Sequence, residues 1–291
     1  MNSIRKIKKI LMGLPTMEGA GVRLKRVFGF SETPLFDPFL LLDDFRSCTP
    51  EHYLKGFPWH PHRGIETITY VLQGDVEHGD SLGNTGRISK GDVQWMTAGS
   101  GIIHQEMPKG DGKGCMLGFQ LWANLPAADK MMAPRYRDIS AADVPEVRLD
   151  GGVKIKIICG RVGDVIGPVR DIVIDPLYLD ISLPSRTAYE HRTPAGHTVF
   201  AYVIDGSACF AGEGREEFGN ETAVLFADGD TVSVKTFDSP VRFLLVAGRP
   251  LGEPIAWRGP IVMNTRSELD AAFAEYADGT FIRRGDYSKR D

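Results

Sequence analysis

The hydrophobic and polar residues of this chain alternate as short β-branched and aromatic runs separated by turn residues. The 291 residues include 33 glycines and 18 prolines. This pattern is typical of an all-β sandwich or barrel. The predicted strands cover residues 67–72, 93–97, 118–123, 154–159, 177–181, 199–204, 223–226 and 241–246. Glycine-containing triplets predict turns at residues 73–75, 90–92, 205–207 and 228–230.

A weak internal repeat indicates two copies of one β-fold. Residues 68–74 (ITYVLQG) resemble residues 200–206 (FAYVIDG), and residues 90–93 (KGDV) resemble residues 228–231 (DGDT). The order of these segments agrees although their spacing drifts. The stretch 127–145 is richer in charge, Met and Pro, and we interpret it as the connection. We therefore predict two domains, 1–135 and 136–291.

One amphipathic helix is predicted near the end of the chain. Ser267 is a candidate N-cap for a helix over residues 268–277, and Gly279 is a plausible stop. The apolar residues recur at i, i+3, i+4 and i+7, which places on one face Leu269, Ala272, Phe273 and Tyr276. We expect this face to pack on a barrel.

Charge and composition exclude several classes of function. The net charge of −4 argues against a general nucleic-acid binder, which needs a basic face. No apolar run approaches the roughly 18 residues of a membrane span. The basic segment 4–11 is expected to be a first strand or its lead-in. The scattered cysteines are predicted to be free thiols in a reducing compartment, and they are Cys48, Cys115, Cys159 and Cys209. We expect a cytoplasmic monomer, or a nuclear location in a eukaryote.

Two histidine-bearing steps carry the candidate chemistry. One is His60-Pro61-His62 and the other is His104-Gln105-Glu106. Residues two apart on a strand point to the same face, so each step can aim two ligands into one space. A pair of histidines can also lie by chance on a solvated strand. However, the chain has only seven histidines, and three of them fall in these windows beside apolar or glycine-rich segments. Three imidazoles and a carboxylate suit a transition metal such as iron.

These and other motifs resemble the pirin family over essentially the whole chain. The matching strings are FDPFLLLDDF at 36–45, HPHRGIET at 60–67, GDVQWMTAG at 91–99, GIIHQEM at 101–107, LWANL at 121–125 and GPIVMNT at 259–265. The resemblance implies two antiparallel jelly-roll (cupin) β-barrels that face each other. It also implies one iron-type site in the N-terminal barrel, held by His60, His62, His104 and Glu106. The same ligands suit Mn, Co, Ni, Cu and Zn, and Fe(II) is the expected ion.

One carboxylate competes with Glu106. The wider cupin pattern places a carboxylate ligand shortly after the His-x-His pair, where this chain has Glu66; the pirin pattern favours Glu106 and leaves Glu66 as an outer acceptor or a solvated group. In the second half, His191 and His197 lack a His-x-Glu counterpart, and residues 241–246 in the equivalent place are almost all apolar. We expect that barrel to be metal-free, with both histidines at the surface or in ordinary core.

Two kinds of function remain open. The resemblance implies quercetin 2,3-dioxygenase activity, in which a flavonol-like substrate binds the metal and reacts with O2 while Glu106 acts as a general base. Aromatic and Met residues near the motifs could wall an apolar pocket, although barrel core is the simpler reading for Trp95; they are Phe57, Trp59, Trp95 and Met107. The alternative is a non-enzymatic iron- or redox-sensing regulator with a protein partner, either a transcriptional coregulator or a modulator of a metabolic enzyme.

Overall fold

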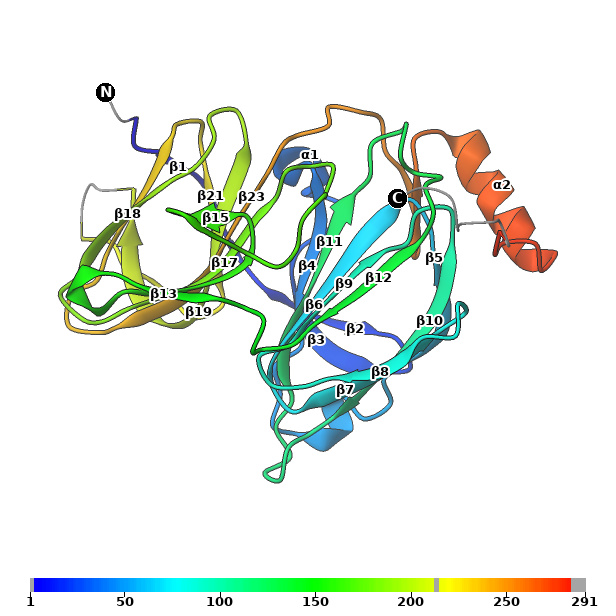
Figure 1. Ribbon diagram of the computed structural model, residues 1–291, viewed down its shortest axis with the longest axis horizontal. Helices are drawn as coiled ribbons and strands as arrows, with labels where there is room; N and C mark the ends of the chain where they lie inside the picture. The colour runs from blue at the N-terminus through cyan, green and yellow to red at the C-terminus, as the bar shows by residue number, and fades with distance from the viewer. Residues whose placement is uncertain (1–2, 212–214, 284–291) are drawn as a thin grey trace. The chain divides into compact units, whose positions relative to one another are not determined.

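The protein folds into two β-rich units. A computed structural model describes residues 3–211 and 215–283 (Figure 1). Unit 1 comprises residues 1–14, 31–38 and 142–251, and unit 2 comprises residues 15–30, 39–141 and 252–291. The predicted all-β class with antiparallel strands and a short C-terminal helix is confirmed. No helix among the described residues is long and apolar enough to cross a membrane.

Neither unit is one continuous segment: the N-terminal residues belong to unit 1, and the C-terminal residues belong to unit 2. The units therefore depart from the predicted division at 135/136. The first strand, β1 (Ile7–Met12), pairs with β21 (Thr222–Phe226) of unit 1, which confirms a strand in the basic N-terminal segment. The last part of the chain returns to unit 2, where the Val262 amide donates to the carbonyl of Arg63 at 3.1 Å. These pairings join residues about 200 positions apart, and hydrophobic periodicity carries no information about them.

Unit 2 consists of two antiparallel sheets. The seven-stranded sheet has the order β12-β9-β6-β11-β4-β3-β2, and the four-stranded sheet has the order β5-β10-β7-β8. The first sheet contains β2 (Leu14–Glu18), β3 (Val22–Phe28), β4 (Phe39–Asp44), β6 (Ile65–Gln73), β9 (Val93–Thr97), β11 (Leu117–Asn124) and β12 (Arg135–Ile139). The second contains β5 (Phe57–His62), β7 (Asp75–Asp80), β8 (Thr85–Ile88) and β10 (Ile102–Lys109). A short hairpin and a helix complete the unit: β24 (Ala256–Arg258), β25 (Ile261–Met263) and α2 (Arg266–Ala277). A 3₁₀ turn at Pro50–His52 precedes β5.

Unit 1 is built on the same principle around a filled interior. Its large sheet follows the order β1-β21-β19-β23-β17-β14-β13, and β22 joins β18 to the end of β19. Besides β1 and β21, its strands are β13 (Glu146–Arg148), β14 (Lys154–Cys159), β15 (Arg161–Val162), β16 (Val165–Ile166), β17 (Leu177–Leu183), β18 (Ala188–Arg192), β19 (Thr198–Phe210), β20 (Phe218–Gly219), β22 (Thr231–Lys235) and β23 (Val241–Gly248). One short helix, α1 (Thr33–Phe36), and a 3₁₀ turn at Asp150–Gly152 complete it.

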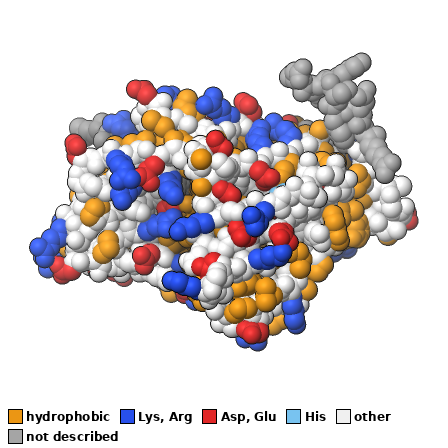
Figure 2. Space-filling view, turned by 60° about the horizontal axis from the view of Figure 1, so that its bottom comes forward, with side chains coloured by type: hydrophobic (Ala, Val, Ile, Leu, Met, Phe, Trp, Pro, Cys, Tyr) orange, Lys and Arg blue, Asp and Glu red, His pale blue; other side chains and the backbone are white. Residues whose placement is uncertain are grey.

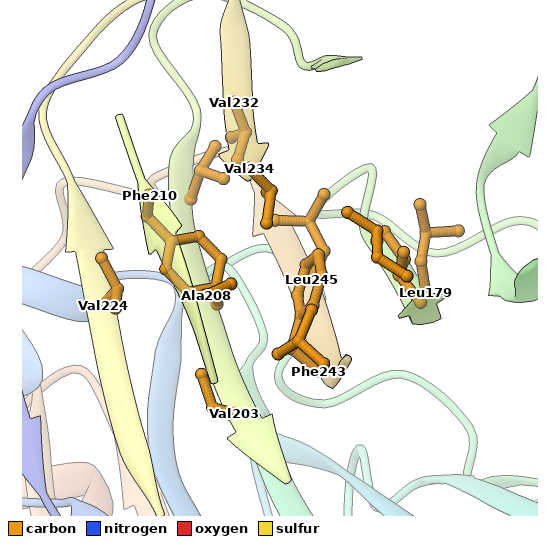
Figure 3. Close-up of a cluster of buried hydrophobic side chains, with 14 of the residues drawn as sticks. Leu179, Val203, Ala208, Phe210, Val224, Val232, Val234, Phe243 and Leu245 are labelled. Atoms are coloured by element: carbon orange, nitrogen blue, oxygen red, sulfur yellow. The ribbon is translucent and has the colours of Figure 1, made fainter. Parts of the chain in front are cut away.

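The core of unit 1 follows directly from the period-two pattern of its strands. Every second residue of β17, from Leu177 to Leu183, belongs to one buried cluster, and so does every second residue of β23, from Val241 to Ala247. Figure 3 shows part of this cluster, with Phe210, Phe243 and Leu245 filling the space between the strands. Aliphatic and aromatic side chains therefore occupy the interior of this barrel.

All eight predicted strand segments lie within strands, whereas the predicted turn at 205–207 is wrong. These residues lie inside β19, which pairs first with β21 and β23 and then with β20 and β22. The register shifts between Val203 and Asp205, and Gly206 has a φ of 69° with the Pro240 carbonyl only 1.9 Å from where a Cβ would stand. A bulge at Ile204, followed by the left-handed Gly206, thus bends one long strand between two pairings instead of reversing the chain.

The strand pairing also corrects the repeat alignment. In unit 2, β9 and β11 flank β6; in unit 1, β21 and β23 flank the first half of β19. Hence β23 is the counterpart of β11, and β22, which pairs with β18, is the counterpart of β10. The prediction that residues 241–246 stand in the place of the His-x-Glu step is wrong, because that place is taken by β22.

The C-terminal helix begins two residues earlier than predicted. Its N-cap is Thr265, whose hydroxyl accepts from the Glu268 amide at 3.2 Å while the Glu268 carboxylate accepts from the Thr265 amide at 2.8 Å. This reciprocal capping box satisfies two amides, whereas Ser267 lies within the first turn. Leu269 and Ala272 are buried against Ile261 and Met263, so the apolar face packs on unit 2 as expected.

Two of the four cysteines form a disulfide, which contradicts the prediction of four free thiols. Cys48 and Cys115 are bonded across 67 residues. Their neighbours Ser47 and Met116 exchange two backbone hydrogen bonds of 2.8 Å, and this bridge brings the two segments side by side. The other two, Cys159 and Cys209, are buried thiols outside any disulfide, as expected.

The face drawn in Figure 2 carries Lys and Arg side chains interspersed with Asp and Glu. Neither sign of charge forms a continuous field on this face. The mixture agrees with the small net charge of −4.

Candidate metal centre

Two neighbouring strands of unit 2 bring the predicted ligands together. β5 pairs with β10, and the register places His104 opposite His60 and Ile102 opposite His62. His60 and His62 point to the same side of β5 because they are two residues apart. β5 is the edge strand of its sheet, where Pro58 and Pro61 are tolerated because one side of the strand makes no ladder hydrogen bonds.

The two histidines of β5 are oriented by backbone carbonyls. Nδ1 of His60 donates to the Pro58 carbonyl at 2.8 Å, and Nδ1 of His62 donates to the Pro260 carbonyl at 3.1 Å. In the neutral rings, both Nε2 atoms are then unprotonated acceptors. These two Nε2 atoms lie only 3.1 Å apart. Two lone pairs at this separation repel each other, and a cation bound by both would relieve the repulsion.

His104 supplies the third ligand. Its side chain is buried, and neither ring nitrogen has a hydrogen-bond partner among the described residues. Its ring centroid lies 4.4 Å from that of His60 and 5.0 Å from that of His62. One potential ligand atom from each of the three histidines lies within 4.8 Å of the others. A buried imidazole without a partner is costly, so this arrangement fits a metal ion.

The two candidate carboxylates have different surroundings. Glu106 is buried, and its Oε1 accepts from the Thr69 hydroxyl at 3.0 Å; the carboxylate is not part of the three-histidine group. Glu66 is also buried, and its two oxygens accept from the Thr97 hydroxyl at 2.7 Å and from Trp95 Nε1 at 3.2 Å. Both oxygens of Glu66 are thus engaged by neighbouring side chains of its own sheet.

The electrostatic environment favours neutral ligands. Burial lowers the pKa of His60, and burial together with neighbouring imidazoles lowers the pKa of His62 and His104 well below the usual value. Neutral imidazole is the form that binds metals. Burial also raises the pKa of Glu106, partly offset by the hydrogen bond from Thr69. Glu106 is therefore a stronger base than an exposed glutamate.

A cavity of about 640 Å³ opens onto this centre. His60, His62 and Glu106 form part of its wall, and its apolar lining includes Phe30, Phe57, Trp59, Trp122 and Trp257. Its volume is that of a typical small-molecule site. Of the predicted pocket residues, Phe57 and Trp59 line the cavity. Trp95 is fully buried in the core, which confirms the simpler interpretation, and Met107 is not among the lining residues.

Unit 1 has valines where unit 2 has ligands. Val232 and Val234 of β22, the counterpart of β10, belong to the apolar core (Figure 3). His191 of β18 is buried and accepts from, or donates to, the Tyr189 hydroxyl at 2.8 Å. Among the described residues, His60, His62 and His104 of unit 2 form the single cluster of metal-ligating side chains.

Several residues at the centre have no local sequence signal. Pro260, which orients His62, is 198 residues away from it. Arg63 is buried and links the ligand strand to the C-terminal segment: its Nε donates to the Ser100 carbonyl at 2.7 Å and it forms an ion pair of 2.7 Å with Glu275 of α2. Only the GPIVMNT string, matched as a family motif, pointed to the C-terminal segment.

Several known proteins are similar to this chain in both sequence and fold. Residues 21–123 match the family model Pirin, and residues 178–282 match the Pirin C-terminal cupin domain. A protein of Pseudomonas aeruginosa named "Putative quercetin 2,3-dioxygenase" is 44% identical over 283 residues, covering 96% of this chain and 99% of the relative. Human pirin is 38% identical, covering 95% and 93%. The crystal structure of quercetin 2,3-dioxygenase from Acinetobacter baumannii superimposes with a TM-score of 0.86 at 31% identity, covering 96% and 99%.

Proposed function

The chain belongs to the pirin family of the cupin superfamily, and from this membership we propose that it is an iron-dependent dioxygenase of the quercetin 2,3-dioxygenase type. The reaction is the O2-dependent ring cleavage of a flavonol-like substrate. The observation that carries the proposal is the cavity in unit 2, which joins an aromatic lining to three converging histidines and a buried carboxylate. The names of the relatives from P. aeruginosa and A. baumannii support the same reaction.

In this proposal, His60, His62, His104 and Glu106 hold one Fe(II) ion. Bound iron supplies a Lewis acid for the flavonol oxygens and a redox centre for O2. The carbonyls of Pro58 and Pro260 keep two of the imidazoles in the tautomer that ligates through Nε2. The ligand set also admits other divalent transition metals, and Fe(II) is our expectation from the family.

Glu106 has a second role, as general base for the flavonol hydroxyl. It lines the cavity, and burial raises its pKa toward that of a useful base. The Thr69 hydroxyl holds one carboxylate oxygen in place. The aromatic side chains of Trp122 and Trp257 line the space in which a planar substrate would lie.

Oxygen consumption in the presence of quercetin tests the proposal. The iron-loaded protein should consume O2, and Glu106→Gln should reduce the rate per bound metal by about 10²–10⁴-fold, because an amide cannot accept the hydroxyl proton. Glu77→Gln is the matched control, since Glu77 is an exposed residue of the same unit that pairs with Lys109. A metal-replete wild-type protein that leaves quercetin untouched under air would refute this activity.

A further inference from the structure

A row of polar side chains crosses the wall of the cavity. Arg26 of β3, Asp43 of β4, Gln120 of β11 and Thr69 of β6 are successive register partners across four adjacent strands. Register partners project from the same face of a sheet. All four line the cavity. The row starts at the candidate metal centre, because the Thr69 hydroxyl lies 3.0 Å from Oε1 of Glu106 and 2.6 Å from Oε1 of Gln120.

Apolar side chains lie on both sides of this row. Leu24 and Phe45 lie two residues from Arg26 and Asp43 along their strands, and Leu41 and Trp122 lie two residues from Asp43 and Gln120 on the other side. All four also line the cavity. The wall is therefore an apolar surface with one polar stripe. Such a surface fits an aromatic molecule that carries hydroxyl groups along one edge. A plain hydrocarbon in the same place would leave the polar side chains of the stripe without hydrogen-bond partners.

The far end of the stripe is a cluster of three charged groups. Arg26 donates through Nε and Nη2 to the two oxygens of Asp43, at 2.9 and 2.7 Å, and through Nη1 to Oε1 of Glu18 at 2.8 Å. Two carboxylates thus accept hydrogen bonds from one guanidinium. When all three groups are ionised, the cluster of Arg26, Asp43 and Glu18 carries a net charge of −1. Asp43 is buried, whereas the side chain of Glu18 is 41% exposed and lines the cavity. This end can accept hydrogen bonds from a ligand and repels anions.

The separation of the two ends suits a three-ring phenol. Asp43 and Thr69 are two strands apart in the sheet, which corresponds to about 10 Å at the usual strand spacing. A ligand whose reactive hydroxyl lies beside Glu106 can therefore place hydroxyls of its remote ring near the charged cluster.

We propose that Glu18, held by Arg26 and Asp43, is a specificity-determining residue that accepts hydrogen bonds from hydroxyls on the ring of the substrate remote from the metal. The proposal rests on the function proposed above, since it assigns the substrate class of the same cavity. It selects neutral polyhydroxylated aromatics over analogues that lack the remote hydroxyls or carry an anionic group there.

Equilibrium binding under nitrogen tests the proposal independently of the reaction with O2. Quercetin and 3-hydroxyflavone share the 3-hydroxyl, but only quercetin carries hydroxyls on the remote rings. Their affinities for the metal-loaded full chain can be measured by quenching of tryptophan fluorescence, because Trp122 and Trp257 line the cavity. We expect quercetin to bind at least about tenfold more tightly, the factor that one hydrogen bond to a charged group commonly supplies.

Glu18→Ala should reduce this ratio to near one. Because Glu18 is partly exposed, its removal should leave the ion pair between Arg26 and the buried Asp43 intact. The control Glu77→Gln should retain the wild-type ratio. Equal affinities of the two flavonols for wild type, an unchanged ratio in Glu18→Ala, or no binding of either flavonol would each overturn the proposal. A wild-type preference for quercetin that Glu18→Ala abolishes, found in a protein that consumes no O2, would uphold the specificity site and refute only the dioxygenase activity.

Discussion

Exchanging each of the two buried glutamates for glutamine should separate their roles. Glu66 accepts hydrogen bonds from Thr97 and Trp95 and is not among the residues that line the cavity, whereas Glu106 lines it. In Glu66→Gln, the amide NH2 must face one of these two donors, and an unsatisfied buried donor costs about 1–3 kcal/mol. Burial also raises the pKa of Glu66, so the ionised carboxylate is itself costly and the neutral amide recovers part of this loss.

We therefore expect Glu66→Gln to destabilise the protein by about 1 kcal/mol, or about 2–4 °C in the midpoint of thermal unfolding. Its metal affinity should fall by no more than the roughly 10–100-fold that is typical of a group outside the ligand set. Glu106→Gln should weaken metal binding more and stability less. Competition with a chromophoric chelator measures the affinity, and scanning calorimetry of the metal-free proteins measures the stability. If Glu66→Gln lost the metal while Glu106→Gln retained it, the ligand assignment would be reversed.

Two further perturbations test other parts of the structure. Burial lowers the pKa of His191 to about 4, so the unfolded chain binds a proton that the folded chain does not between pH 6.5 and 4. Stability is thus lost as the pH falls through this window, by up to about 3 kcal/mol, and urea unfolding should show a shallower pH dependence for His191→Leu than for wild type; parallel curves would contradict this. Thr265→Ala removes the capping box of α2 and should cost about 1 kcal/mol locally, seen as several-fold faster amide hydrogen exchange in α2. Unchanged exchange would show that packing alone holds this helix.

The parts of the fold that could be predicted from sequence are those governed by local periodicity. The alternation within β17 and β23 gives both strands and their buried faces, and the spacing of His60 and His62 gives two ligands on one face. The helix was predicted for the same reason. Its first residue was misplaced because Thr265 and Ser267 are both good caps, and only the reciprocal bond with Glu268 decides between them.

The remaining features depend on contacts between distant segments. The pairing of β1 with β21 and the Cys48–Cys115 disulfide join residues 67 or more positions apart, and neither has a local pattern. The polar stripe from Arg26 to Thr69 is invisible in the sequence for the same reason, because its members become neighbours only through strand register. The ligand set could be expected from the family motifs, whereas the cavity wall required the structure.

The metal content of the purified protein tests the central claim most directly, namely that one metal centre lies in unit 2 on three histidines. After loading with Fe(II) and removal of unbound ions, elemental analysis should find one ion per wild-type chain and one in His197→Ala, a control in unit 1. It should find essentially none in His104→Ala, because this variant lacks one of the three imidazoles. In the wild type, the His104 imidazole has no hydrogen-bond partner among the described residues. Two ions per wild-type chain, or a full complement in His104→Ala, would contradict the account.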